Sequence, residues 1–199
     1  MKNNYHKKVT REDKFARKYY CQRARLNSIR IDKKFNKRKF RRKVNKMKYY
    51  IYTDGATSNN GRANAKGGWA AIFIKNEANQ EYEIRSGGEM PTTNQRMELT
   101  GAIEGLSMIP KLSFGDEVIL YTDSAYLCNC YLNKWYCSWE RNGWRNSKKE
   151  PVANQDLWEK LISYFKNPQI TISKVKGHSG NYYNELVDEL AVNEREKLM

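Results

Sequence analysis

Two aspartates stand out because each follows a short run of residues that favour β-strands. Residues 49–52 (YYIY) lead into a Thr-Asp-Gly sequence with its aspartate at 54, and residues 118–121 (VILY) lead into Thr-Asp-Ser with its aspartate at 123. Aromatic and β-branched residues are enriched in strands, so we expect each strand to stop at its aspartate. Open α/β sheets bind ligands at the carboxyl ends of their strands. Asp54 and Asp123 are therefore expected to lie side by side.

Two further carboxylates, Glu98 and Asp188, lie on segments that the sequence predicts to be helical. Glu98 shares a helix face with Gly101, Ala102 and Gly105, and a glutamate among small or apolar neighbours needs a partner or a metal. Taken by itself, a glutamate such as Glu98 is more often a solvated helix charge. Four acids without a cysteine or several histidines suit Mg2+ or Mn2+ better than zinc. Two such ions can activate a water for in-line phosphoryl displacement.

The elements around these acids predict an α/β domain. Residues 49–54, 69–74 and 81–88 read as three strands separated by polar turns, which is typical of an antiparallel meander. Thr93 or Asn94 is expected to cap the helix that follows. The remaining predicted elements are strands at 118–122 and 169–175, and helices at 125–132, at 154–166 and around Asp188.

Positive charge is concentrated at the N-terminus. The 199-residue chain has a net charge of +15, and residues 1–48 hold 20 of the 37 Lys and Arg with 3 of the 22 acids, a net +17 (20 minus 3). Residues 49–199 carry −2 (17 minus 19). We therefore expect a basic arm at 1–48, partly helical or disordered, before a folded domain at 49–199. Such an arm suits contact with a nucleic acid backbone, and a solvated tail is the alternative.

An aromatic and basic stretch between residues 134 and 149 includes Trp135, Trp139 and Trp144. Aromatic faces beside Lys and Arg form a surface on which sugars, bases or backbones can rest. The alternative for each tryptophan is burial in the core. The stretch is thus a second region, besides the arm, at which a nucleic acid is expected.

The sequence does not have the features of a membrane or secreted protein. Its first residues lack an apolar signal core, and no apolar run approaches the ~18 to 20 residues of a membrane span. The four cysteines, at positions 21, 128, 130 and 137, fit no paired metal spacing and are expected to be free thiols. We expect a soluble, cytoplasmic monomer with no membrane partner.

Six motifs follow one another along the chain, and their order and spacing resemble those of type 1 ribonuclease H. They are TDGA from 53, TTNQRMEL from 92, YTDS from 121, PVANQDLW from 151, KGHSG from 176 and NELVDELA from 184. The resemblance covers about residues 49–197. It implies a ribonuclease H-like fold, in which a five-stranded mixed sheet, with its first three strands antiparallel, has helices on both faces.

The resemblance also assigns catalytic roles to individual residues. The metal-binding carboxylates that it implies are Asp54, Glu98, Asp123 and Asp188. His178 matches the mobile catalytic histidine, which can change its charge near neutral pH. The implied cofactor is a pair of Mg2+ ions, with Mn2+ as a substitute.

Substrate contacts are implied in the same way. The residues that would read the minor groove on the RNA strand are Asn60, Asn94 and Gln95. Thr93 and Asn154 match a pocket for one phosphate of the DNA strand, and Trp135 and Trp139 match the channel along that strand. Asn and Gln amides both donate and accept hydrogen bonds, as the 2′-hydroxyl of RNA does.

The expected function is an endoribonuclease that hydrolyses the RNA strand of RNA-DNA hybrids by a two-metal mechanism, leaving 3′-hydroxyl and 5′-phosphate ends. Another nuclease or transposase with a related sheet is one alternative, and the TTNQR and KGHSG motifs argue against it. A catalytically silent protein that binds hybrids or RNA is the other alternative, and the presence of all four acids argues against that. The partner is an RNA-DNA hybrid in the first case.

The arm leads to a prediction about affinity. Deleting residues 1–47 should leave turnover of saturating hybrid nearly intact and weaken binding, because an arm that contacts phosphates releases counterions. The slope of log affinity against log salt, roughly −0.9 per phosphate neutralised, should become shallower by several units in the truncated protein. Equal slopes for the two proteins would show that the arm does not contact the substrate.

Overall fold

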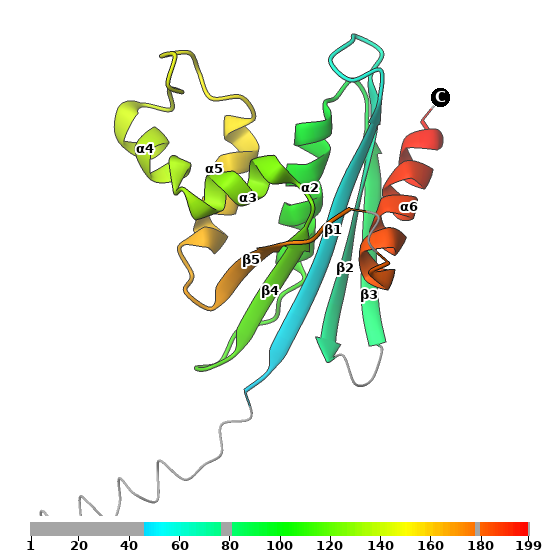
Figure 1. Cartoon of the computed structure of the whole chain (residues 1–199), viewed down its shortest axis with the longest axis vertical. Helices are drawn as coiled ribbons and strands as arrows, with labels where there is room; N and C mark the ends of the chain where they lie inside the picture. The colour runs from blue at the N-terminus through cyan, green and yellow to red at the C-terminus, as the bar shows by residue number, and fades with distance from the viewer. Residues whose placement is uncertain (1–45, 77–80, 178–179, 199) are drawn as a thin grey trace, which may run out of the picture. The chain divides into compact units, whose positions relative to one another are not determined.

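The computed structural model describes residues 46–76, 81–177 and 180–198, which form one five-stranded sheet with five helices packed around it (Figure 1). The strands are β1 (Lys48–Ser58), β2 (Lys66–Asn76), β3 (Glu81–Glu89), β4 (Glu117–Thr122) and β5 (Ile170–Lys174). The helices are α2 (Asn94–Ser107), α3 (Ala125–Leu132), α4 (Trp135–Asn142), α5 (Gln155–Phe165) and α6 (Tyr182–Glu196). In this part of the chain, no helix has both the length and the apolarity needed to cross a membrane.

The sheet is mixed and has the strand order β3-β2-β1-β4-β5. β1, β2 and β3 pair antiparallel, as the meander in the sequence predicts. β4 pairs parallel with β1 on one side and with β5 on the other. The mixed sheet that the sequence implied is confirmed, and β1 lies at its centre as the strand where the two kinds of pairing meet.

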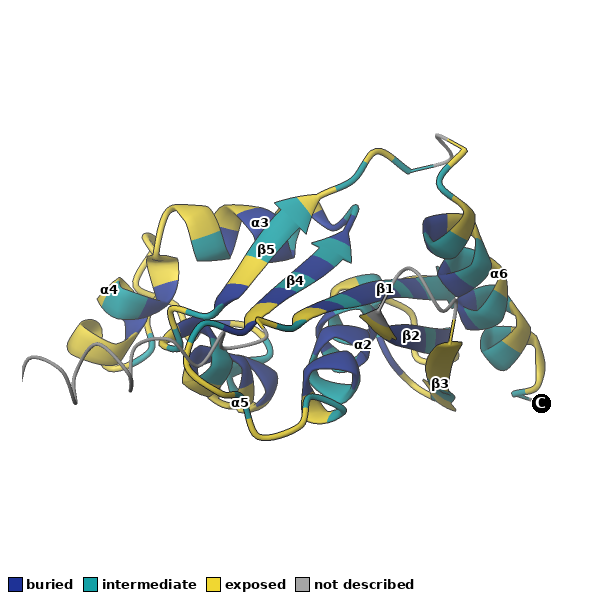
Figure 2. Ribbon diagram, turned by 90° about the horizontal axis from the view of Figure 1, so that it is seen from below, coloured by how far each residue is buried: buried dark blue, intermediate teal, exposed yellow. Residues whose placement is uncertain are grey.

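Apolar residues cover both faces of this sheet, because successive side chains of a strand point to opposite faces. Ile51 and Phe73 pack on the face covered by α2, α3 and α5, where the largest buried side chain is Trp158. Tyr52 and Ile72 belong to the other face, where α6 contributes Val187 and Ala191. Figure 2 shows α6 on one side of the sheet and α2 and α5 on the other. The prediction of helices on both faces is confirmed.

Strand β1 does not stop at Asp54, contrary to the expectation from the sequence. It runs on to Ser58, and its pairing with β2 continues from Asp54 opposite Ala70 to Ser58 opposite Lys66. The pairing with β4, by contrast, ends at Tyr52 opposite Tyr121. Asp54 is therefore located where one neighbouring strand ends and the other continues.

Gly55 allows the start of α2 to pack directly on this part of β1. A Cβ atom at position 55 would lie 2.4 Å from the backbone nitrogen of Glu98 and 2.8 Å from the Cβ of Met97. Real Cβ atoms do not approach backbone so closely, so only glycine fits. The helix that carries Glu98 is brought against the strand that carries Asp54 for this reason.

The carboxylate of Asp116 anchors the residues just before β1 through hydrogen bonds. Its Oδ1 accepts a bond from the backbone N–H of Met47 at 3.0 Å, and its Oδ2 accepts one from the N–H of Ser113 at 2.7 Å. The carbonyl of Met47 in turn accepts from Glu117 N at 2.9 Å.

Nearly all of the expected arm, residues 1–45, lies outside the described residues. A deletion of residues 1–45 would keep these contacts and is the cleaner form of the arm truncation.

Tyrosine rings pack helix α6 against the sheet. The ring of Tyr183 lies 5.4 Å from that of Tyr52 on β1 and 6.0 Å from that of Tyr82 on β3, measured between centroids. Aromatic pairs at such distances add to the stabilisation that comes from burial alone. These contacts fix the first turn of α6, and through it the position of Asp188.

Candidate active site

Asp54 and Asp123 lie at the same level of two neighbouring parallel strands. Tyr52 of β1 is opposite Tyr121 of β4, and each aspartate follows its tyrosine by two residues. Both carboxylates are half-buried, and the backbone N–H of Gly55 donates to Asp54 Oδ1 at 2.7 Å. Strand register therefore brings together the two acids that the paired Thr-Asp motifs single out.

Glu98 lies in the second turn of α2 and is held by hydrogen bonds from two elements. The side-chain amide of Asn94 donates to its Oε1 at 2.9 Å, and the hydroxyl of Ser124 donates to its Oε2 at 2.5 Å. Ser124 is also the N-cap of α3, where its oxygen accepts from Leu127 N at 3.2 Å. One carboxylate thus connects α2 to the start of α3, directly after Asp123.

The electrostatics place all four acids in one neighbourhood. Burial raises the pKa of Asp54 to about 7, with the negative charge of Asp123 as the next cause and those of Asp188 and Glu98 adding to it. The Gly55 hydrogen bond opposes this rise. Burial is also the main cause that raises the pKa of Glu98, where the Ser124 hydrogen bond opposes it and Asp123 adds to it. Among the described residues, the charges that raise the pKa of Asp54 are those of carboxylates.

This arrangement fits a hard divalent cation better than any other group. Within residues 46–76, 81–177 and 180–198, no three acidic, His or Cys side chains converge to metal-ligand distance. Carboxylates that raise one another's pKa repel, and a cation bound among them would relieve that repulsion. The potential ligands are half-buried carboxylate oxygens. Oxygen donors of this kind are the ones that Mg2+ and Mn2+ prefer.

The loop between β5 and α6 passes close to Asp123. A Cβ atom on Gly177 would lie 2.8 Å from Asp123 Oδ2, so the backbone passes close to the carboxylate, and a larger residue here would require that carboxylate to move. The next residue is His178, which lies outside the described residues, as does Ser179. The described end of this loop nevertheless leads the chain to the acids.

Asn60 and Asn94, two of the expected RNA contacts, are joined by hydrogen bonds. Asn60 Oδ1 accepts from the backbone N–H of Asn94 at 3.1 Å, and the hydroxyl of Thr57 donates to Asn94 Oδ1 at 3.2 Å. Both ends of the Asn94 side chain are engaged, because its amide nitrogen donates to Glu98. Gln95 is exposed. Sequence reasoning missed Thr57 and Ser124, since neither hydroxyl has a pattern of its own.

Thr93 and Asn154, expected to hold a DNA phosphate, are the residues before α2 and α5. Thr93 is the N-cap of α2, and its hydroxyl oxygen accepts from Arg96 N at 3.3 Å. Asn154 has a left-handed backbone, with φ 57°, and its side chain makes no cap hydrogen bond. An ion pair between Arg96 and Asp156 connects the two helices. Sequence reasoning missed this pair, although both residues lie inside motifs that it quoted.

The two tryptophans expected to line a channel differ in exposure. Trp135 is 38% exposed, whereas Trp139 is 8% exposed and packs against Trp144 and Trp158. Both line a hollow of about 590 Å³, together with Tyr126 and Arg145. Burial, one of the two alternatives from the sequence, holds for Trp139, which is a core residue that also lines the hollow. Contact with a nucleic acid stays a prediction for both tryptophans.

Comparison with known proteins gives the class of this protein. The sequence profile of the RNase H family matches residues 46–196. The chain is 48% identical to the ribonuclease H of Syntrophomonas wolfei over 143 residues, which cover 72% of this chain and 92% of the relative. It is also 48% identical to the ribonuclease H of Moorella thermoacetica over 141 residues, 71% of this chain and 87% of the relative.

Solved structures agree with this result. LC9-RNase H1, described as a type 1 RNase H with the type 2 active-site motif, aligns with 77% of this chain and 74% of its own at a TM-score of 0.62 and 25% identity. LC11-RNase H1, solved in complex with RNA/DNA hybrid, shares the fold at a TM-score of 0.53 and 20% identity, over 75% of this chain and 97% of its own. The chain belongs to the ribonuclease H family, as the six motifs indicated.

Removing the charge of Asp54 should stabilise the metal-free protein. An acid whose pKa is about 7 in the folded state and 3.8 in the unfolded state costs no stability below pH 4. The cost grows as the pH rises towards 7 and amounts to at most about 4 kcal/mol above it. In chelator, Asp54→Asn should therefore raise the melting temperature at pH 8 and leave it nearly unchanged at pH 4. Thermal unfolding across this range is the measurement.

The control is Glu159→Gln, which changes an exposed carboxylate on α5 bonded only to Gln155 among the described contacts. It should shift the melting temperature little at any pH. A destabilised Asp54→Asn protein at pH 8 would contradict the prediction.

Proposed function

We propose that this protein is an endoribonuclease that hydrolyses the RNA strand of RNA-DNA hybrids and leaves 3′-hydroxyl and 5′-phosphate ends. It is a ribonuclease H by family, and relatives with nearly half of their residues identical carry that name. The proposal rests above all on the half-buried acids of β1 and β4, which lie at one level of the sheet with Glu98 beside them. Such a cluster of negative charge is costly unless it serves a cation.

Asp54, Glu98, Asp123 and Asp188 would hold two Mg2+ ions, with Mn2+ as a substitute. Bound there, the ions supply a water nucleophile at neutral pH and stabilise the leaving oxygen. Asn94 and Ser124 orient the carboxylate of Glu98. His178, on the loop that approaches Asp123, assists proton movement or product release, since an imidazole changes charge near neutral pH.

The remaining residues recognise the duplex. Asn60, Asn94 and Gln95 lie at the start of α2 and the end of β1, where their amides and the backbone between them would face the minor groove and its 2′-hydroxyls. Thr93 and Asn154 would hold a phosphate of the DNA strand, and the hollow beside Trp135 and Trp139 would receive that strand further along.

The arm and the cellular setting complete the proposal. The basic residues that precede β1 in the sequence would act as an arm that adds contacts to phosphates of the duplex. The three described cysteines are free, which suits a reducing cytoplasm. All the residues proposed for the site belong to one chain, which is compatible with action as a monomer.

Cleavage of a labelled RNA-DNA hybrid tests this function. With Mg2+ the protein should cut the RNA strand of the hybrid and leave duplex RNA and duplex DNA intact, and chelator should abolish cutting. Asp54→Asn should lose all but about 1% of the rate, because removal of a metal ligand leaves no nucleophile. Hybrid binding in Ca2+ should persist in this variant. Binding without cleavage by the unaltered protein would leave only the silent hybrid-binding alternative.

Substitutions in α2 separate RNA reading from catalysis. Asn94→Ala should lower kcat, because Glu98 loses a hydrogen bond and its orientation. Gln95→Ala, its matched neighbour, should keep kcat. The ratio of kcat/KM between hybrids with and without one 2′-hydroxyl at the cut should fall by about three- to tenfold, the effect of losing one neutral hydrogen bond. The comparison uses kcat/KM for hybrids that differ at that position. Identical effects of the two variants would show that these neighbours do not have separate roles.

A further inference from the structure

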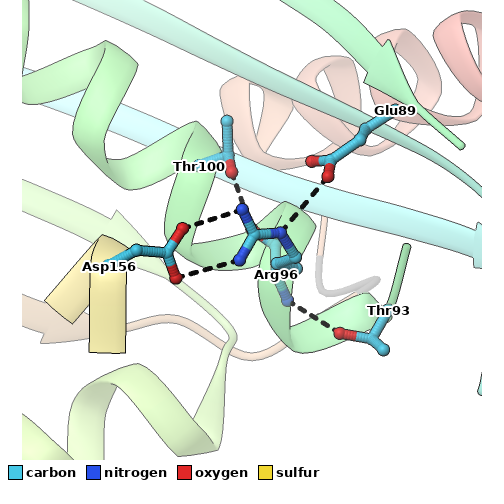
Figure 3. Close-up of polar contacts among 5 residues, drawn as sticks. All are labelled: Glu89, Thr93, Arg96, Thr100 and Asp156. Atoms are coloured by element: carbon cyan, nitrogen blue, oxygen red, sulfur yellow. Dashed lines mark hydrogen bonds and ion pairs between the residues drawn. The ribbon is translucent and has the colours of Figure 1, made fainter. Parts of the chain in front are cut away.

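Arg96 joins three separate elements of the fold through its guanidinium group (Figure 3). Nη1 and Nη2 donate to Asp156 Oδ1 and Oδ2 at 3.0 and 2.9 Å, a two-point contact from α2 to α5. Nε donates to Glu89 Oε1 at 3.3 Å, at the end of β3. A planar guanidinium paired at two points fixes both distance and angle, which a single bond cannot do.

Stability is a weak reason for this arrangement. The side chain of Asp156 is 56% exposed and that of Glu89 is 42% exposed, while that of Arg96 is 28% exposed. Ion pairs open to solvent in this way contribute on the order of 0 to 1 kcal/mol. What the contact does provide is a fixed geometry between the ends of two helices.

The residues at these two helix ends are those expected to hold one phosphate. The backbone N–H of Arg96 donates to the hydroxyl of Thr93, so the residue whose side chain reaches Asp156 lies in the helical turn that Thr93 caps. Asn154 precedes Asp156 by two residues, and its carbonyl accepts from Leu157 N at 3.1 Å and Trp158 N at 3.0 Å. Its place is therefore fixed by the first turn of α5, the same turn that Arg96 holds.

Charge supports the same conclusion. Asp156 lies in the first turn of α5, and Glu89 lies near the start of α2, so both carboxylates would repel a phosphate at the helix N-termini. Arg96 compensates them: its hydrogen bonds are the main cause that lowers the pKa of Asp156. With its guanidinium committed to two carboxylates, Arg96 is placed to support a phosphate site, not to be the phosphate ligand.

We propose that Arg96 is a positioning residue that sets the spacing of Thr93 and Asn154, so that both grip one phosphate of the DNA strand. This role rests on the function proposed above. Under this proposal, Arg96 and Asp156 affect substrate affinity indirectly, by positioning Thr93 and Asn154. Losing the two-point contact should free α5 to shift relative to α2 and should weaken the grip on that phosphate alone.

The test combines a variant with a modified substrate. Arg96→Lys keeps the charge and removes the fork, and Asp156→Asn keeps the shape and weakens the pair. The substrates are hybrids that carry a single neutral methylphosphonate at successive positions of the DNA strand. With the unaltered full-length protein, one position should raise KM by about tenfold, the effect of losing a charged contact. Both variants should raise KM on the normal hybrid, keep kcat within about twofold, and no longer respond to that position.

Arg85→Lys is the matched control, since Arg85 contacts Glu104 and Ser107 at the other end of α2. It should keep the response of the unaltered protein. If the Arg96 and Asp156 variants keep the full methylphosphonate effect, or lose kcat with KM unchanged, the positioning role is wrong. If the unaltered protein cuts every modified hybrid equally, the phosphate grip of Thr93 and Asn154 is itself wrong, and Arg96 has nothing to position.

Discussion

Parallel pairing between β1 and β4 is the constraint on which the rest of the site depends. It places two aspartates, almost 70 residues apart in sequence, at one level of the sheet. The result is a concentration of negative charge that burial makes more costly, as the raised pKa of Asp54 shows. The fold contributes the apolar packing of two sheet faces to hold those charges in place. The mutual repulsion of these carboxylates is an electrostatic cost that the proposed cations would relieve.

Hydrogen bonds around the acids connect the residues proposed to bind metal with those proposed to contact the substrate. Glu98 is shared between α2 and α3 through Asn94 and Ser124. Arg96 then joins α2 to α5 through a two-point contact with Asp156. Each connection is short and directional, so the start of α2 links Glu98 to the amides proposed to face the minor groove and to the proposed phosphate site.

Much of this could be predicted from the sequence because the signals are local. Thr-Asp after a β-prone run located Asp54 and Asp123, and the cap at Thr93 followed from its residue type. The end of β1 was wrong, because continued pairing with β2 is a property of the partner strand and not of the residues after Asp54. Arg96, Thr57 and Ser124 could not be assigned either, since a hydrogen bond across 60 residues leaves no periodic pattern. His178 stays a prediction.

The turn between β1 and β2 illustrates how a surface segment can be tied to the interior. Asn60 belongs to this exposed turn, yet its side chain accepts the first free backbone N–H of α2, four residues before Glu98. Inserting residues here would carry Asn60 away and leave that solvent-exposed N–H to water. Length variation is usually tolerated in surface loops. In this loop a change of length would also remove the hydrogen bond that connects the turn to the start of α2.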